Sequence, residues 1–327
     1  MILIISHTGD PHARAVAREL RAAGTPYHLY DTARFPTRSS LSLGYGSGTH
    51  SVLIDGDKLI DLQDVRAVWW RRPQPFQLHA EVSGEAVRNW TYGEATEAFE
   101  GLYRVLDTYW INDPSQDLIA SRKAYQLKVA AAVGLRIPHT LITSEPVRAR
   151  AFTDELGHDR TVYKPFKGTE EVWRETRVLR REELALLDNV KYAPLIFQEY
   201  IEATADLRIT VVGDRLFPAA IYAARSKYPQ DFRMDLGNCP IKATELPRPL
   251  EKRLLKLMRQ LGLVYGAIDM RLTPQGDYVF LEINPAGQWL FVEQVTGQPI
   301  ARTLAEQLTR AAAPERPAEQ IAVAQER

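Results

Sequence analysis

The chain has 327 residues, 45% of them hydrophobic and 25% charged, an ordinary globular composition with room for two or three domains. Its 41 lysines and arginines balance its 41 aspartates and glutamates, so the net charge favours neither nucleic acid nor an anionic membrane as a partner. A single cysteine excludes a disulfide framework, and no apolar run is long enough for a signal peptide or a membrane span. We therefore expect a soluble cytoplasmic protein.

The N-terminal part of the chain has the pattern of an α/β scaffold. An apolar strand at residues 2–5 precedes a helix that Asp10 caps, with Pro11 at its first position, and a second strand follows at residues 27–30. The turn between strand and helix lacks the G-x-G-x-x-G pattern, so we expect no dinucleotide site there. Short strands joined by glycine turns are expected over residues 41–62.

An apolar strand at residues 65–70 leads directly into two arginines, Arg71 and Arg72. Because neighbouring residues of a strand point to opposite faces, only one of the two need face a cleft. The pair either binds an anion or provides one surface charge and one ion pair, and the pattern leaves both interpretations open. A helical pattern over residues 81–109 then ends before Pro114, where we place the first domain boundary.

Two lysines are notable in the middle of the chain. Lys123 opens a predicted helix, and Lys164 lies in an otherwise apolar strand at residues 161–166. A buried lysine is rare unless it has a partner, so Lys164 either meets an anion such as phosphate or extends its ammonium group to the surface. The polar loop that follows contains one glycine, Gly168.

The second half of the chain alternates strands and helices. A short helix is expected at residues 181–188, a strand at residues 195–201 and a hairpin over residues 208–222. An amphipathic helix follows at residues 250–261. After a last helix at residues 300–312 the polar tail is expected to be disordered.

The most informative stretch is a predicted strand in which Phe280, Glu282 and Asn284 share one face. A turn joins it to an upstream strand at residues 266–272, and a four-residue turn places Asp269 directly opposite Glu282. Neighbouring carboxylates raise each other's pKa unless a cation neutralises them, and hard cations take oxygen ligands. These residues therefore form either a Mg²⁺ site or a structural ion-pair cluster.

These signals, in this order over residues 115–310, resemble the ATP-grasp superfamily. The residues that carry the resemblance are Lys123, Tyr163-Lys164-Pro165-Phe166, Gln198-Glu199-Tyr200-Ile201, Asp206-Leu207-Arg208, Asp269 and Glu282-Ile283-Asn284. The stretches Trp70-Arg71-Arg72-Pro73 and Pro285-Ala286-Gly287-Gln288-Trp289 are similar to the graspetide (microviridin-type) ligases, which mature ribosomal peptides. The resemblance spans nearly the whole chain.

The resemblance implies an α/β (α+β) chain with the ATP-grasp fold. A Rossmann-like pre-ATP-grasp domain would occupy residues 1–114. A central α+β domain, residues 115–200, would supply the nucleotide lid and a possible docking site for a leader peptide. A C-terminal domain, residues 201–313, would contain the metal and catalytic residues, and residues 314–327 would be the tail.

The resemblance also implies a role for individual residues. ATP would lie between two small sheets, with Lys123 and Lys164 at its α- and β-phosphates. The segment Gln198, Glu199, Tyr200 and Ile201 would bind the nucleotide, with the backbone from Glu199 to Ile201 along the adenine edge. Mg²⁺ would be held by Asp269, Glu282 and Asn284. The charge that develops during transfer would be stabilised by Arg208, Arg225 and Arg233.

The implied activity is that of an ATP-dependent macrocyclase. Asp or Glu side chains of a precursor peptide would become acyl phosphates, and Ser/Thr hydroxyls or Lys amines would displace phosphate, giving ester or amide crosslinks. One alternative is a ligase that adds an amino acid to a protein terminus or a small molecule; another is a nucleotide-binding interaction protein without turnover. The implied partners are the precursor's leader, docking near residues 181–188 and 208–222, and a second copy in a homodimer.

Overall fold

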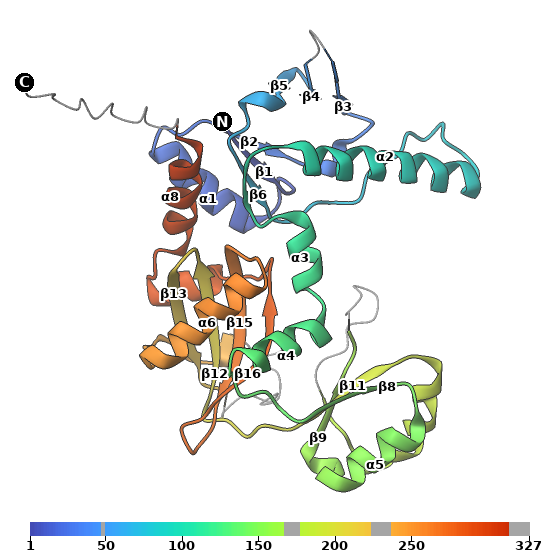
Figure 1. Ribbon diagram of the computed structural model, residues 1–327, viewed down its shortest axis with the longest axis vertical. Coiled ribbons are helices and arrows are strands. Elements are labelled where there is room, and N and C mark those ends of the chain that lie inside the picture. Colours follow the sequence, from blue (N-terminus) through green and yellow to red (C-terminus); the bar gives the residue numbers. More distant parts are fainter. Residues whose placement is uncertain (47–49, 167–176, 224–236, 314–327) are drawn as a thin grey trace, which may run out of the picture. The chain divides into compact units, whose positions relative to one another are not determined.

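A computed structural model describes residues 1–46, 50–166, 177–223 and 237–313 (Figure 1). The chain forms two compact units, Met1–Trp110 with the residues from Ala305 onward, and Ile111–Leu304. The glycine-poor loop around Gly168 and the polar tail after Pro314 lie outside the described residues. The domain boundaries inferred from the sequence stay a prediction.

The N-terminal unit is built on a four-stranded sheet in the order β2-β1-β6-β7, in which β1 runs parallel to both β2 and β6. Its elements are β1 (Ile2–Ile5), α1 (Pro11–Ala22), β2 (Tyr27–Tyr30), β6 (Ala67–Trp70), α2 (Glu85–Val105) and β7 (Tyr109–Ile111). The Asp10 side chain caps α1 by accepting the His12 N–H at 3.0 Å, as the sequence predicted. The predicted strand–helix–strand order is confirmed.

A second, antiparallel sheet in this unit has the order β3-β4-β5, and short 3₁₀ helices flank it. These elements are β3 (Ser39–Ser42), β4 (Val52–Asp55), β5 (Lys58–Asp61), η1 (Thr32–Arg34) and η2 (Leu62–Asp64). The helix predicted over residues 81–109 was wrong at both ends. It starts only after Gly84, whose φ of +82° is not helical, and Tyr109 already belongs to β7 beside β6.

Arg71 is buried and paired, which confirms the ion-pair interpretation for this residue. Its Nε lies 3.1 Å from Asp10 Oδ2, and both side chains are almost completely excluded from solvent. Burial alone would raise the pKa of Asp10, but the Arg71 charge, the His12 N–H and the Ser6 hydroxyl outweigh it. The pKa of Asp10 therefore lies below its ordinary value of 3.8.

The larger unit contains a five-stranded antiparallel sheet in the order β14-β13-β12-β15-β16. Its strands are β12 (Ala205–Val212), β13 (Arg215–Ile221), β14 (Ile241–Ala243), β15 (Tyr265–Leu272) and β16 (Tyr278–Asn284). Leu207, Ile209 and Val211 of β12 face the main hydrophobic core, as expected from the period of two along a strand. Asp206 and Arg208 therefore lie on the opposite face.

Helices cover the core face of this sheet. The helices that begin in this unit are α3 (Pro114–Ala120), α4 (Lys123–Ala132), α5 (Pro146–Leu156), α6 (Arg248–Gln260), α7 (Leu290–Thr296) and α8 (Ile300–Ala312). The apolar stripe of α6 buries Leu250, Leu254 and Leu257 against the sheet, each contributing about 1.5–3 kcal/mol. The amphipathic helix predicted at residues 250–261 is thereby confirmed.

A smaller antiparallel sheet of the same unit has the order β10-β9-β11-β8. Its elements are β8 (Thr140–Thr143), β9 (Thr161–Lys164), β10 (Arg177–Val178) and β11 (Leu195–Glu199), with the 3₁₀ helices η3 (His158–Arg160) and η4 (Arg181–Tyr192). A separate core joins α5, η4 and this sheet through Phe152, Leu187 and Phe197. Mixed α/β structure throughout confirms the predicted fold class. Among the described residues, no helix is both long enough and apolar enough to span a membrane.

The buried Arg71–Asp10 pair leads to a stability prediction. Arg71→Ala should lower the free energy of unfolding by about 3–5 kcal/mol, because it leaves the Asp10 carboxylate buried without its cation. Since the folded pKa is lowered, this contribution is complete above pH 3.8 and is lost as the pH falls through the folded value. The difference in the free energy of unfolding between variant and wild type should therefore become smaller in acid.

Urea unfolding followed by tryptophan fluorescence, near neutrality and in acid, measures both effects. Arg18→Ala is the matched control, because Arg18 is exposed on α1. Equal stability of the Arg71→Ala and Arg18→Ala proteins near neutrality would contradict the stabilising role of the pair.

Candidate active site

Asp269 of β15 lies directly opposite Glu282 of β16, as predicted, but the chain reaches this register by a different route. Leu272 pairs with Tyr278, so the turn is one residue longer than the predicted four-residue turn. A register shift between Asp269 and Met270 compensates for the extra residue. A β-bulge of this kind re-aims the side chains on one side of it.

The bulge also changes which residues of β16 share a face. Phe280 was predicted on the face of Glu282, but both Phe280 and Ile283 pack into the main hydrophobic core. Strict alternation cannot place residues 280 and 283 on one face, whereas an extra residue between them can. Glu282 is thereby separated from the apolar face of its own strand.

Each carboxylate of this facing pair is matched by a cation. Arg208 of β12 pairs with Asp269 in the strand register, and its Nη1 lies 2.7 Å and 2.8 Å from the two Asp269 oxygens. Lys123, the first residue of α4, donates from Nζ to Glu282 Oε2. The structure thus brings four predicted site residues together in one unit.

Asn284 follows two residues after Glu282 at the end of β16 and opposite Ala267. It is exposed, and its Oδ1 accepts the N–H of Ala286 at 3.0 Å. Two carboxylates and one amide supply only oxygen ligands, which suits Mg²⁺. The described residues contain no group of three His, Cys, Asp or Glu placed to hold a metal ion. The donor set fits Mg²⁺, and the ion pairs that the sequence left as the alternative are also present.

Gln126 fixes Lys123 relative to the strand that carries Glu282. It is buried on α4; its Nε2 donates to the Ile283 carbonyl at 2.8 Å, and its Oε1 accepts the Ile283 N–H at 3.1 Å. Because β16 is the edge of its sheet, this side chain replaces the neighbouring strand. Sequence reasoning missed Gln126, although a glutamine among the buried positions of a helix is a signal of such a role.

The loop after β16 is held against the sheet by three contacts. The Gln288 carbonyl accepts from Arg208 Nη2 at 2.8 Å, and the Gly287 carbonyl accepts from the Tyr265 hydroxyl at 2.6 Å. The Asn112 amide donates to the Pro285 carbonyl at 3.2 Å and to the Tyr265 carbonyl at 2.9 Å. The loop therefore orients Arg208, and Arg208 in turn fixes the loop.

Gly287 is required by the close approach of this loop to β15. A Cβ at this position would overlap the Cβ of Ala267 and lie 3.2 Å from Arg208 Nη2. The contact gives a physical reason for glycine in the Pro-Ala-Gly-Gln-Trp stretch. Trp289, the next residue but one, is completely buried.

Apart from Lys123 on α4, the predicted nucleotide residues lie on the smaller sheet and just beyond it. Lys164 is half-buried at the end of β9, and Gln198 is buried with its Nε2 3.0 Å from Thr140 Oγ1. The Glu199 and Tyr200 N–H groups donate to the carbonyls of His139 and Arg160, both at 2.8 Å.

Ile201 comes next, and its N–H has no acceptor within the part of the chain that the structure describes. Its backbone can therefore contribute a donor to a nucleotide base. Of the three predicted catalytic arginines, only Arg208 is described; Arg225 and Arg233 lie outside the described residues.

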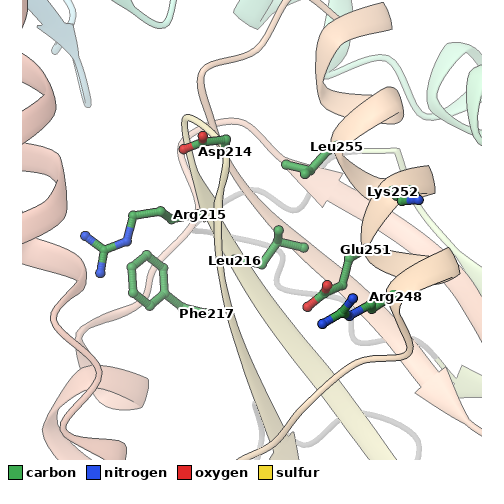
Figure 2. A pocket seen from close by; sticks show the side chains of 8 residues that line it. All are labelled: Asp214, Arg215, Leu216, Phe217, Arg248, Glu251, Lys252 and Leu255. Atoms are coloured by element: carbon green, nitrogen blue, oxygen red, sulfur yellow. The ribbon is translucent and has the colours of Figure 1, made fainter.

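A groove of about 450 Å³ lies elsewhere in this unit, between the tip of the β12–β13 hairpin and α6 (Figure 2). Leu216 and Leu255 form its apolar part, and Arg248, Glu251 and Lys252 supply charges of both signs. None of the predicted site residues lines it. The groove is thus separate from the carboxylate pair.

The tight contact at Gly287 leads to a prediction with its own rescue. Gly287→Ala should destabilise the protein by about 1–3 kcal/mol, the usual cost of overpacking. The double variant Gly287→Ala/Ala267→Gly removes the Ala267 methyl group that the new side chain would overlap, and it should regain part of that stability. Thermal unfolding of the two single variants and the double variant measures the coupling, and strictly additive effects would contradict the proposed contact.

Both the N-terminal and the C-terminal part of the chain match known protein families. Residues 1–117 match the MvdD pre-ATP grasp domain, and residues 120–308 match the RimK-like ATP-grasp domain. Among curated proteins, a probable alpha-L-glutamate ligase of Citrobacter koseri is 26% identical over 218 residues, which is 65% of this chain and 71% of that protein.

Two solved structures are similar over almost the whole chain. The macrocyclase MdnC of Microcystis aeruginosa MRC, bound with precursor peptide MdnA, is 32% identical with a TM-score of 0.86, covering 94% of this chain and 99% of MdnC. A RiPP-associated ATP-grasp ligase of Chryseobacterium gregarium, in complex with ADP and leader and core peptides, is 30% identical with a TM-score of 0.86, covering 96% and 97%. These matches confirm the resemblance inferred from the motifs: the chain belongs to the RimK-like ATP-grasp family and is an ATP-grasp ligase.

Proposed function

We propose that the chain is an ATP-dependent macrocyclase that crosslinks the side chains of a ribosomal precursor peptide. The observation that carries this proposal is the facing pair Asp269 and Glu282, matched by Arg208 and Lys123 and joined to the Pro285–Trp289 loop. The pair supplies oxygen ligands beside two cations, the combination that phosphoryl transfer needs. ATP is the second substrate and Mg²⁺ the cofactor.

The roles of the site residues follow from their charge and position. Asp269, Glu282 and Asn284 would hold Mg²⁺, which neutralises phosphate charge when bound. Arg208 presents a rigid fork of donors that suits a phosphate or a tetrahedral oxyanion better than a lysine does. Its contacts with Asp269 and the Gln288 carbonyl keep that fork in one orientation. Arg225 and Arg233 are proposed to act with it.

The proposed chemistry has two steps on the peptide. An Asp or Glu carboxylate of the precursor attacks the γ-phosphorus of ATP, the bond to ADP breaks, and an acyl phosphate forms. A Ser or Thr hydroxyl, or a Lys amine, then attacks the acyl carbon, loses its proton and expels phosphate. Each ring closed removes the elements of one water from the peptide. The choice between ester and amide depends on which nucleophile the precursor presents.

A peptide substrate is favoured over a free amino acid by the extent of the similarity. MdnC and the Chryseobacterium ligase match more than nine-tenths of this chain, including its N-terminal unit, whereas the glutamate ligase matches 65% of it. Both solved complexes contain peptide. A ligase that adds an amino acid to a protein terminus is the second candidate, supported by the name of that curated relative.

The remaining features are proposed from the sequence. A leader peptide would dock beside the smaller sheet near η4, where Leu186 and Tyr192 are exposed large side chains. The hairpin β12–β13 was proposed with it; Arg208 of that hairpin is buried, so the exposed tip at Asp214 and Arg215 is the part that a leader can reach. A cytoplasmic homodimer completes the proposal.

The test is the intact mass of a precursor peptide encoded beside this chain, after incubation with enzyme, ATP and Mg²⁺. Wild type should remove one water mass per ring, and only when ATP is present. Glu282→Gln should remove none, because the metal site loses a charged oxygen ligand while the side chain keeps its shape. Asp277→Asn is the matched control, an exposed carboxylate in the turn between β15 and β16, and it should crosslink normally.

Other outcomes point to the alternatives. A gain of one amino-acid residue when free amino acids are supplied would establish the terminal ligase instead. Binding of ATP without phosphate release, with every peptide tried, would indicate an interaction protein. Normal crosslinking by Glu282→Gln would remove Glu282 from the metal site.

A further inference from the structure

Two reciprocal ion pairs join β12 to β15 on the face of the sheet that carries the site. Asp206 pairs in register with Arg271, and two residues further along Arg208 pairs with Asp269. Arg271 Nε lies 2.9 Å from Asp206 Oδ1, and both side chains are more than nine-tenths buried. The proposed function gives Arg208 and Asp269 a role, but it gives none to Arg271.

Arg271 reaches beyond its ion pair to the segment assigned to the nucleotide base. Its Nη1 donates to the Ile201 carbonyl at 2.7 Å, and its guanidinium lies 5.4 Å from the centre of the Tyr200 ring. One side chain of β15, the strand that also carries Asp269, therefore contacts two consecutive residues of that segment. A charge-assisted hydrogen bond and a stacked aromatic ring both restrict the local backbone.

The held segment is the exit of β11, after its last residue Glu199. The N–H groups of Glu199 and Tyr200 are used by neighbouring carbonyls, and the Ile201 carbonyl is used by Arg271. The Ile201 N–H is the group that the described part of the protein leaves for a ligand. Its direction depends on the backbone angles of Tyr200 and Ile201, the two residues that Arg271 contacts.

We infer that Arg271, oriented by Asp206, is a positioning residue that sets the edge contact between the backbone at Ile201 and the purine base. The inference rests on the proposed function, in which residues 199–201 lie along the adenine edge. It also gives the two ion pairs separate tasks on one pair of strands. Arg208–Asp269 serves the phosphate end of the nucleotide, and Arg271–Asp206 serves the base end.

The inference predicts a specific loss of base discrimination. Wild type should bind ADP more tightly than 1-deaza-ADP, in which a C–H group replaces the N1 acceptor of adenine, because the aligned Ile201 N–H donates to the adenine edge. In Arg271→Gln this preference should fall about fivefold, the usual effect of losing one hydrogen bond between neutral groups. Affinity for inorganic triphosphate, which has no base, should not change.

Isothermal titration of the full chain with the three ligands measures these affinities. Arg136→Gln is the matched control, since Arg136 forms an exposed pair with Asp277 at the far end of the β15–β16 hairpin. That variant should keep the wild-type preference. Asp206→Asn keeps the shape of its side chain and removes the charge that orients Arg271, so it should lose part of the preference even if Arg271→Gln fails to fold.

The outcomes separate this inference from the proposed function. A wild type without base preference would overturn the adenine-edge assignment, and the inference with it. A wild type with the preference, together with Arg271→Gln and Asp206→Asn proteins that retain it, would overturn the inference alone. If both variants bind ADP, its analogue and triphosphate more weakly by the same factor, the inference is likewise overturned, because that pattern indicates general destabilisation of the protein.

Discussion

The partly buried ion pair between Arg208 and Asp269 is the interaction on which the larger unit's site depends. Removing a carboxylate from water costs several kcal/mol unless a cation and further hydrogen bonds compensate. Arg208 supplies that cation from the adjacent strand, and its remaining donors bind the Gln288 carbonyl. Arg208 thus connects the loop after β16 to Asp269 of β15. That loop can approach closely because residue 287 has no side chain.

The same principle of paired charge applies to both carboxylates of the facing pair. Lys123 and Arg208 form ion pairs with Glu282 and Asp269, which offsets the repulsion between these two facing carboxylates. Under the proposed function, a divalent cation would take over that neutralisation, and the two basic side chains would then bind phosphate oxygens. The hydrogen bonds of Gln126 to Ile283 and of Arg208 to the Gln288 carbonyl orient these side chains. Preorganisation of this kind lowers the cost of assembling a phosphoryl-transfer site.

The sequence predicted those parts of the site whose residues follow a local period or a short motif. The facing of Asp269 and Glu282 was foreseeable from two strands and a turn, but the bulge that produces it was not, because turn length and bulge compensate each other. The ion pair of Arg71 with Asp10 was one of two open interpretations, and only the fold could choose between them. Arg271 and Asn112 were missed because their partners are 70 and 153 residues away. The periodicity of a helix or a strand does not indicate such long-range contacts. The domain boundaries and the roles of the site residues remain predictions.

The central claim, that Asp269 and Glu282 form the metal site of an ATP-grasp ligase, is tested most directly by metal binding itself. Mn²⁺ can replace Mg²⁺ at oxygen sites and is followed by electron paramagnetic resonance. Titration of the full chain with Mn²⁺ in the presence of ADP should show tight binding to wild type and to Asp277→Asn. It should show greatly weakened binding to Asp269→Asn and Glu282→Gln. Unchanged Mn²⁺ affinity in both of these variants would contradict the account.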